Sequence, residues 1–350
     1  MNHSHEEHSC CRMENQKKRP WYLRFLTWTI FASLILLGLS FVFSPLEHFR
    51  HSFAGYMHMM AWPIVLGLLI GGLMDYYVPQ EYVSKYLARK TKRTVFYAAG
   101  LGFLMSACSH GILALSMELH KKGASGPAVI SFLLASPWAN LPITFLLLGF
   151  FGWKGLMIIL TALLISISTG LIFQILDEKN WIEKNRHTAV TDQSFSIRKD
   201  VARRMRAYRF SAAQLGTDLK GVGKGIAGLA DMVLGWVLVG VILAGLAGAL
   251  VPQGIFERFF GPSFTGLLVT MALAAVLEVC SEGTSPLAFE LYQKTGAFGN
   301  AFAFLMGGVV TDYTEIGLVW MNIGRKTAVW MLIITIPQVI LAAAFFNWIF

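Results

Sequence analysis

Two short stretches, far apart in the chain, carry side chains that bind soft or borderline metals. Cys108 and His110 bracket one serine, Cys280 and Glu282 bracket another, and a glycine follows each pair. Thiolate, imidazole and carboxylate groups together suit zinc, copper or a trivalent arsenic centre. We therefore predict that these four residues contact a metal or metalloid species. The alternative is that the cysteines are small packing residues between helices.

Two further polar residues interrupt apolar segments. Asn140 lies between Pro137 and Pro142, and Asp312 follows a pair of glycines. Proline removes a helical hydrogen bond and frees a carbonyl, and glycine lets the backbone open. Freed carbonyls with one amide or carboxylate could form a cradle for an ion or substrate. The alternative is a structural kink in which the side chain only caps freed backbone groups.

Other carboxylates also lie inside apolar segments, where ionisable residues are costly and point to function. We predict that they relay protons or assist binding: Glu118, Glu278, Glu290 and Glu315.

The N-terminal tail is rich in histidine and cysteine, a composition that binds metal although no fixed zinc-finger spacing is present. Its candidate metal ligands are His3, His5, His8, Cys10 and Cys11. The alternative is that these are stray residues of a polar tail.

These residues belong to a chain with too little polar surface for a soluble globule. Of its 350 residues, 55% are hydrophobic and 14% charged, whereas an ordinary soluble domain has about 25% charged residues. A helix needs roughly 20 apolar residues to cross the bilayer. The candidate segments are 24–44, 57–78, 94–119, 126–150, 155–176, 227–250, 264–290, 298–322 and 327–349. We predict an all-α polytopic protein of the plasma membrane, in contact with lipid, with about eight to ten transmembrane or re-entrant helices.

The net charge of +9 comes from basic residues in short loops, which is the membrane pattern and not that of a nucleic-acid-binding face. Basic clusters at 12–19 and 85–93 and a basic linker at 177–226 are all expected on the cytoplasmic side. Since five full crossings would place the linker outside, either 94–119 or 126–150 must be re-entrant. The predicted organisation is a tail (1–22), a first repeat with an extra N-terminal span (23–176), the linker, and a second repeat (227–350).

The two repeats follow from sliding the chain along itself by 172 residues. Cys108-Ser109 then falls on Cys280-Ser281, Gly111 on Gly283, and Asn140 on Asp312. With one re-entrant segment in each half, each half crosses an odd number of times. The halves would then be inverted repeats that face one another at the midplane, as in secondary transporters.

Three motifs in order resemble the predicted-permease family that includes the ArsP-like arsenical efflux permeases. They are Cys108-Ser109-His110-Gly111-Ile112-Leu113, Lys122-Gly123-Ala124-Ser125 and Phe132-Leu133-Leu134-Ala135-Ser136-Pro137. The likeness runs from Trp62 to Phe173 and more weakly through 230–349, and it implies efflux transport. His110 stands where these permeases usually have a second cysteine. Paired thiolates suit trivalent arsenic, whereas cysteine with histidine suits a transition-metal cation.

We therefore expect a secondary exporter of a metal or metalloid species, coupled to protons and compatible with a homo-oligomer. The alternative is a transporter of an unrelated small solute, with structural cysteines. No nucleophile–base pair predicts an enzyme, and no cofactor or nucleic-acid partner is expected. Since no nucleotide-binding domain is found, transport should draw on an ion gradient or on an external partner.

Overall fold

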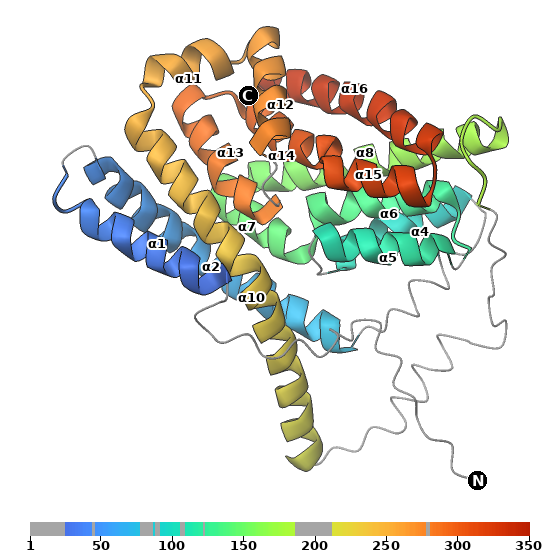
Figure 1. Ribbon diagram of the computed structural model, residues 1–350, viewed down its shortest axis with the longest axis horizontal. Coiled ribbons are helices and arrows are strands. Elements are labelled where there is room, and N and C mark those ends of the chain that lie inside the picture. Colours follow the sequence, from blue (N-terminus) through green and yellow to red (C-terminus); the bar gives the residue numbers. More distant parts are fainter. Residues whose placement is uncertain are drawn as a thin grey trace.

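The computed structural model describes residues 25–43, 46–77, 87, 92–105, 109–121, 123–185, 212–277 and 281–350. Within these ranges the chain forms α-helices and no strand, which confirms the all-α prediction (Figure 1). The helices that precede the linker are α1 (Phe25–Leu39), α2 (Glu47–Tyr77), α4 (Lys92–Leu104), α5 (Ser109–Lys121), α6 (Gly126–Ala139), α7 (Leu141–Phe151) and α8 (Trp153–Glu178). Those that follow it are α10 (Ala212–Leu250), α11 (Gln253–Phe260), α12 (Phe264–Leu277), α13 (Ser281–Thr295), α14 (Phe298–Thr311), α15 (Tyr313–Asn322) and α16 (Arg325–Ile349).

Among the described residues, five apolar stretches are long enough to cross a membrane, and up to seven if each bent helix pair counts as one span. This confirms a polytopic membrane protein. The pair α6–α7 bends by 42° and the pair α11–α12 by 103°. Helix α1 has 15 residues, about 22 Å of helix, and is therefore shorter than the roughly 30 Å bilayer core.

Several helix ends differ from the predicted spans. The predicted segment 94–119 is divided between α4 and α5, and 264–290 between α12 and α13. Helix α10 begins at Ala212, well inside the predicted linker, and its first turns project beyond the neighbouring helices in Figure 1. The predicted surface helix at 197–210 lies outside the described residues.

The helix boundaries of the two halves correspond closely. Shifting the bounds of α4, α5, α6, α7 and α8 by 172 residues reproduces those of α12, α13, α14, α15 and α16 to within two residues. The packing also corresponds, since α6 contacts α4, α5 and α8, and α14 contacts α12, α13 and α16. These agreements support the predicted duplication. The opposite membrane orientation of the halves stays a prediction.

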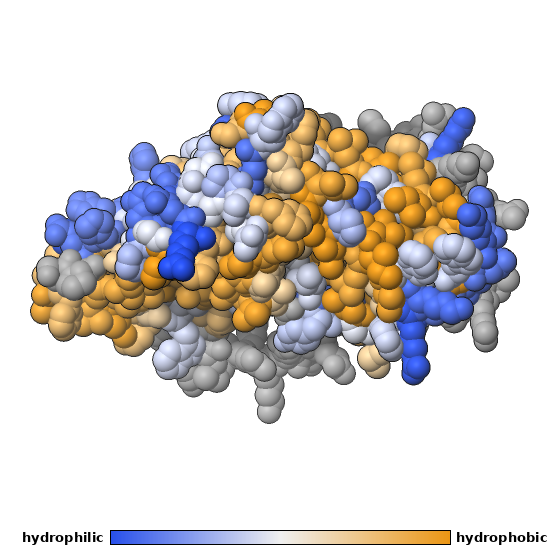
Figure 2. Space-filling view, turned by 90° about the horizontal axis from the view of Figure 1, so that it is seen from above, coloured by the Kyte–Doolittle hydropathy of each residue, from blue (hydrophilic) through white to orange (hydrophobic). Residues whose placement is uncertain are grey.

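Helices α6 and α14 form the centre of the molecule and contact each other. Every residue of α6 is buried, and so is every residue of α14 except its last. A helix that is apolar all round belongs in a protein interior. The other helices surround this pair and present large apolar side chains outward, including Val276, Met321 and Trp348, each more than 80% exposed. Figure 2 shows hydrophobic side chains over most of the visible surface and hydrophilic ones gathered toward its edges, as expected for a surface that faces lipid.

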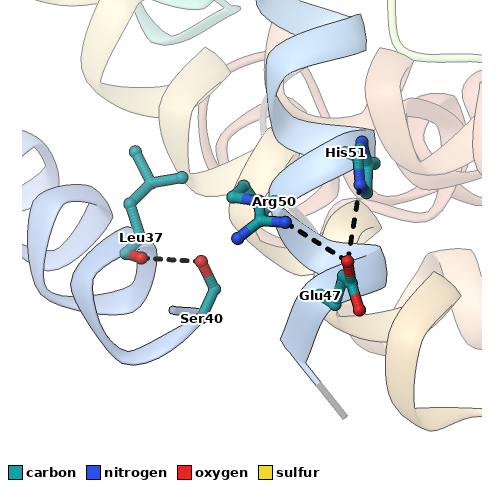
Figure 3. Close-up of polar contacts among 5 residues, drawn as sticks. All are labelled: Leu37, Ser40, Glu47, Arg50 and His51. Atoms are coloured by element: carbon teal, nitrogen blue, oxygen red, sulfur yellow. Dashed lines mark hydrogen bonds and ion pairs between the residues drawn. The ribbon is translucent and has the colours of Figure 1, made fainter. Parts of the chain in front are cut away.

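Polar contacts mark the connection between α1 and α2 (Figure 3). The Ser40 hydroxyl donates to the Leu37 carbonyl at 2.6 Å where α1 ends. In the first turns of α2, Glu47 accepts a hydrogen bond from Arg50 at 3.3 Å and lies 3.9 Å from His51. A carboxylate near a helix N-terminus is favourable. Glu47 therefore stabilises the first turn of α2, which precedes the apolar part of the helix.

The two halves are joined along α8 and α16. Within the membrane, the Gln338 amide donates to the Thr169 hydroxyl at 3.0 Å. Beyond the end of α8, the rings of Trp181 and Trp330 stack with centroids 5.8 Å apart. These contacts fix the last helix of the first half against the last helix of the second.

Glu183 caps the N-terminus of α16. Its carboxylate accepts hydrogen bonds from the backbone N–H groups of Lys326 at 2.9 Å and Thr327 at 3.0 Å, and from the Thr327 hydroxyl at 2.9 Å. Any side chain larger than hydrogen at Gly324 would collide with this carboxylate. Burial raises the pKa of Glu183, but the hydrogen bonds outweigh that effect and lower the pKa below its ordinary value of 4.5.

We predict that Glu183→Gln lowers the melting temperature of the detergent-solubilised protein at pH 7, because the amide loses a charge-assisted acceptor. A carboxyl whose pKa is lowered by folding stabilises the protein above its unfolded pKa and loses this effect as pH falls through the folded pKa. The difference from the parent protein should therefore shrink below about pH 4.5. Glu178→Gln, at an exposed position, is the control. Equal melting temperatures for parent and Glu183→Gln at pH 7 would contradict the cap.

Candidate functional site

The first helix break lies between α6 and α7 at Asn140. The Asn140 side-chain oxygen accepts a hydrogen bond from the Ile143 backbone N–H at 2.9 Å, and its backbone carbonyl accepts one from Thr144 at 2.9 Å. Pro142 occupies the first turn of α7, where its missing N–H costs nothing. The same proline cannot continue α6, so the backbone turns here. Asn140 is thus a helix cap, 2% exposed, at a break surrounded by protein.

The second break lies between α14 and α15 at Asp312 and repeats this hydrogen-bond pattern, although residues 298–322 form one candidate span and not a sharply bent pair. The Asp312 side chain accepts from the Glu315 backbone N–H at 3.4 Å, and its carbonyl accepts from Ile316 at 2.9 Å. The spacing of three and four residues is the same as at Asn140. Both predicted cradle residues therefore cap the helix that follows them, which is the structural alternative that the sequence left open. Whether they also bind a substrate stays a prediction.

Glu282 of the second half reaches the break of the first half. It lies in the first turn of α13, is 5% exposed, and lines a small cavity with Pro142 and Leu146 of α7. The remaining lining residues are apolar and come from α2 and α10: Ile64, Leu68, Val233 and Val237. The Glu282 side chain thus lies against the helix break of the other half, in the wall of an apolar cavity.

The reciprocal contact also exists, because α5 packs against α15 as α13 packs against α7. His110 lies in the first turn of α5, at the position that corresponds to Glu282 after the 172-residue shift. The start of α13 thus lies at the broken helix of the first half, and α5 packs against the broken helix of the second. Cys108, Glu278 and Cys280 lie outside the described residues, as do the tail residues His3, His5, His8, Cys10 and Cys11.

Several buried polar atoms near the two breaks have no hydrogen-bond partner among the described residues. They include the hydroxyls of Ser136, Thr144 and Ser281 and both carboxyl oxygens of Glu315. Glu315 is 2% exposed in the first turn of α15, with Asp312 as a neighbouring negative charge. An unpartnered buried polar group costs about 1–3 kcal/mol. Their presence beside helix breaks indicates a region suited to polar occupants.

The remaining predicted accessory residues differ in their surroundings. Glu118 is half-buried in α5. Glu290 is buried in α13, where its carboxylate accepts a hydrogen bond from the Tyr56 hydroxyl and lies 3.9 Å from Lys294. Tyr56 could not be identified from the sequence, because a neutral tyrosine in an apolar span is ordinary. Among the described residues, no group of three or more His, Cys, Asp or Glu side chains could hold a metal ion.

The described helices are those of a polytopic membrane protein, and comparison with known proteins identifies its class as a membrane permease. Residues 46–347 match the predicted permease family ArsP_1, so the chain belongs to this family. This confirms the resemblance found in the sequence motifs.

Two relatives cover most of the chain. The UPF0718 protein YcgR of Bacillus subtilis is 23% identical over 284 residues, 80% of this chain and 90% of YcgR. A Streptococcus mutans protein named "Putative two-component membrane permease complex subunit" is 23% identical over 255 residues, 71% of this chain and 78% of that protein. No solved structure matches the chain.

We predict that Asn140→Ala destabilises the protein by about 0.5–2 kcal/mol, the usual cost of losing a helix cap, whereas Asn140→Asp keeps the acceptor and most of the stability. Unfolding in a denaturant series, in one detergent, measures both. If Asn140→Ala is as stable as the parent, the cap does not matter. If Asn140→Asp is stable but inactive in transport, the side chain also belongs to the substrate cradle.

Proposed function

We propose that this permease is a secondary exporter of a metal or metalloid species, with the transported species bound between the broken helices of its two halves and exchanged for protons. The observation that carries the proposal is the placement of Glu282 in the cavity against Pro142 of the other half. Non-helical backbone at membrane depth is tolerated where it is buried in protein or lines a cavity. Interrupted helices at a repeat interface are the usual substrate site of secondary transporters.

The proposed ligands come from both halves: Cys108, His110 and Asn140 from the first, and Cys280, Glu282 and Asp312 from the second. The cysteines and the histidine supply soft or borderline donors, and the carboxylates supply charge. Carboxylates taken out of water favour their protonated form as a class, whereas a bound cation favours the ionised form. Cation binding and proton release are therefore linked, and the unpartnered Glu315 is the proposed proton carrier beside Asp312.

A second candidate is a transporter of a small polar solute with structural cysteines. It is supported by the unpartnered hydroxyls of Ser136, Thr144 and Ser281 beside the breaks.

A resistance and transport panel separates the two candidates. Cells with and without the chain are tested against arsenite, antimonite, Cd²⁺, Zn²⁺ and Ag⁺, and uptake of each species into inside-out vesicles is followed with and without a pH gradient. The proposal expects protection against at least one species and uptake driven by the pH gradient. Absence of both for every species would favour the second candidate.

Single substitutions then test the ligands. Removing a soft donor should reduce transport at least about tenfold, since even indirect partners of a metal site contribute 10–100-fold in affinity. We predict this loss for Cys108→Ser and Cys280→Ser at unchanged protein level, and a shift of preference toward arsenite for His110→Cys. The matched control replaces Cys10 and Cys11 by serine, which should weaken metal capture by the tail and leave transport largely intact. Parent-like transport by all three variants would make the cysteines packing residues.

A further inference from the structure

Helix α13 carries Glu282, and its position depends on contacts two turns further along. Glu290 lies eight residues after Glu282, about 12 Å along the helix. It is 5% exposed, and its carboxylate accepts the hydrogen bond of Tyr56 from α2. Lys294, one turn later, lies 3.9 Å from the same carboxylate. A buried carboxylate thus connects α13 to a helix 234 residues away in sequence.

Helix α10 forms the other wall around this carboxylate. A Cβ atom at Gly248 would collide with the Glu290 carboxylate, and one at Gly240 would collide with the backbone of Gly283, next to Glu282. Small residues let membrane helices approach closely. Gly240 therefore allows α13 to pack closely on α10 near Glu282, and Gly248 allows the same near Glu290. In the contacts described here, the titratable groups next to Glu290 are Tyr56 and Lys294.

The ring of Tyr56 also contacts α7, the helix that supplies the opposite wall of the cavity. It packs edge to face on Phe150 of α7 at 6.0 Å and on Phe289 of α13 at 6.1 Å. The Phe150 and Phe289 rings lie 5.0 Å apart. Tyr56 therefore contacts both α7 and α13 through its ring, and its hydroxyl adds the hydrogen bond to Glu290.

We infer that Tyr56 is a positioning residue, which holds Glu290 by its hydroxyl and thereby sets α13 so that Glu282 faces the cavity against Pro142. Glu290 acts here as a hydrogen-bond acceptor. The second half has no equivalent of Tyr56, because the corresponding positions of α10, 228 and 229, are glycine and leucine. This inference rests on the proposed function for the role of Glu282, but the position of α13 is measurable without transport.

The test compares Tyr56→Phe, Glu290→Ala and Glu290→Gln with the parent, and Tyr77→Phe, at an exposed tyrosine of the same helix, is the control. Arsenite and Cd²⁺ uptake into inside-out vesicles gives KM and maximal rate. Amide hydrogen exchange of 283–294, in nanodiscs, reports the position of α13. A lost hydrogen bond to a charged group should raise KM at least about fivefold in Tyr56→Phe and Glu290→Ala, with a nearly unchanged maximal rate. Exchange in 283–294 should become faster in both variants.

Glu290→Gln decides between positioning and charge, since its amide oxygen still accepts the Tyr56 hydrogen bond. The inference expects Glu290→Gln to recover most of the affinity and of the exchange protection. It is overturned if Glu290→Gln is as impaired as Glu290→Ala, or if Tyr56→Phe matches the Tyr77→Phe control in both measurements. If the parent transports neither arsenite nor Cd²⁺, the proposed substrates are wrong. The exchange pattern alone then decides the inference, which fails if all variants exchange like the parent.

Discussion

A backbone N–H or C=O that loses its helical partner inside a bilayer has no water to bond and must be satisfied by the protein. The arrangement of this molecule depends on that constraint at two places, Asn140 and Asp312. At each break the side chain accepts the N–H three residues later and the carbonyl accepts the N–H four residues later. Each break is therefore stable only when enclosed, and the helices of the opposite half provide part of that enclosure.

Close packing of the helices within each half follows from small residues at defined positions. Gly240 and Gly248 let α13 lie directly against α10. Gly67 similarly brings α2 against Pro142, since a Cβ there would lie 3.0 Å from the proline Cα. Polar side chains fix the distance between the two halves. The hydrogen bond from Gln338 of α16 to Thr169 of α8 is one example. Because lipid tails are as apolar as the helix surfaces, the hydrophobic effect does not drive helices together in a membrane. Close packing and hydrogen bonds stabilise the helix contacts instead.

Much of this arrangement could be predicted from the sequence, for reasons that are visible in particular residues. Apolar length located the spans, and the polar breaks at Asn140 and Asp312 were recognised because proline and glycine pairs interrupt apolar runs. The 172-residue repeat predicted which residues would correspond, and the helix bounds agree with it. The 15-residue length of α1 and the early start of α10 were missed, because hydropathy alone does not register where a helix ends.

The candidate site was less predictable, because its contacts join residues far apart in the chain. The proximity of Glu282 to Pro142 depends on how α13 packs on α7, which no local pattern encodes. The capping role of Asn140 was an open alternative, since the same residue type serves both a cap and a cradle. Tyr56 gave no signal, because its importance comes only from Glu290 on a distant helix.

The most direct test concerns the opposed orientation of the halves, which the proposed site between their broken helices requires. Single cysteines are introduced within 186–206 and at position 350, and a membrane-impermeant maleimide is applied to intact cells and to inside-out vesicles, with the reactivity of the parent protein subtracted. The inverted-repeat account predicts that 186–206 is labelled only from the cytoplasmic side and position 350 only from the outside. Labelling of both positions from the same side would contradict it.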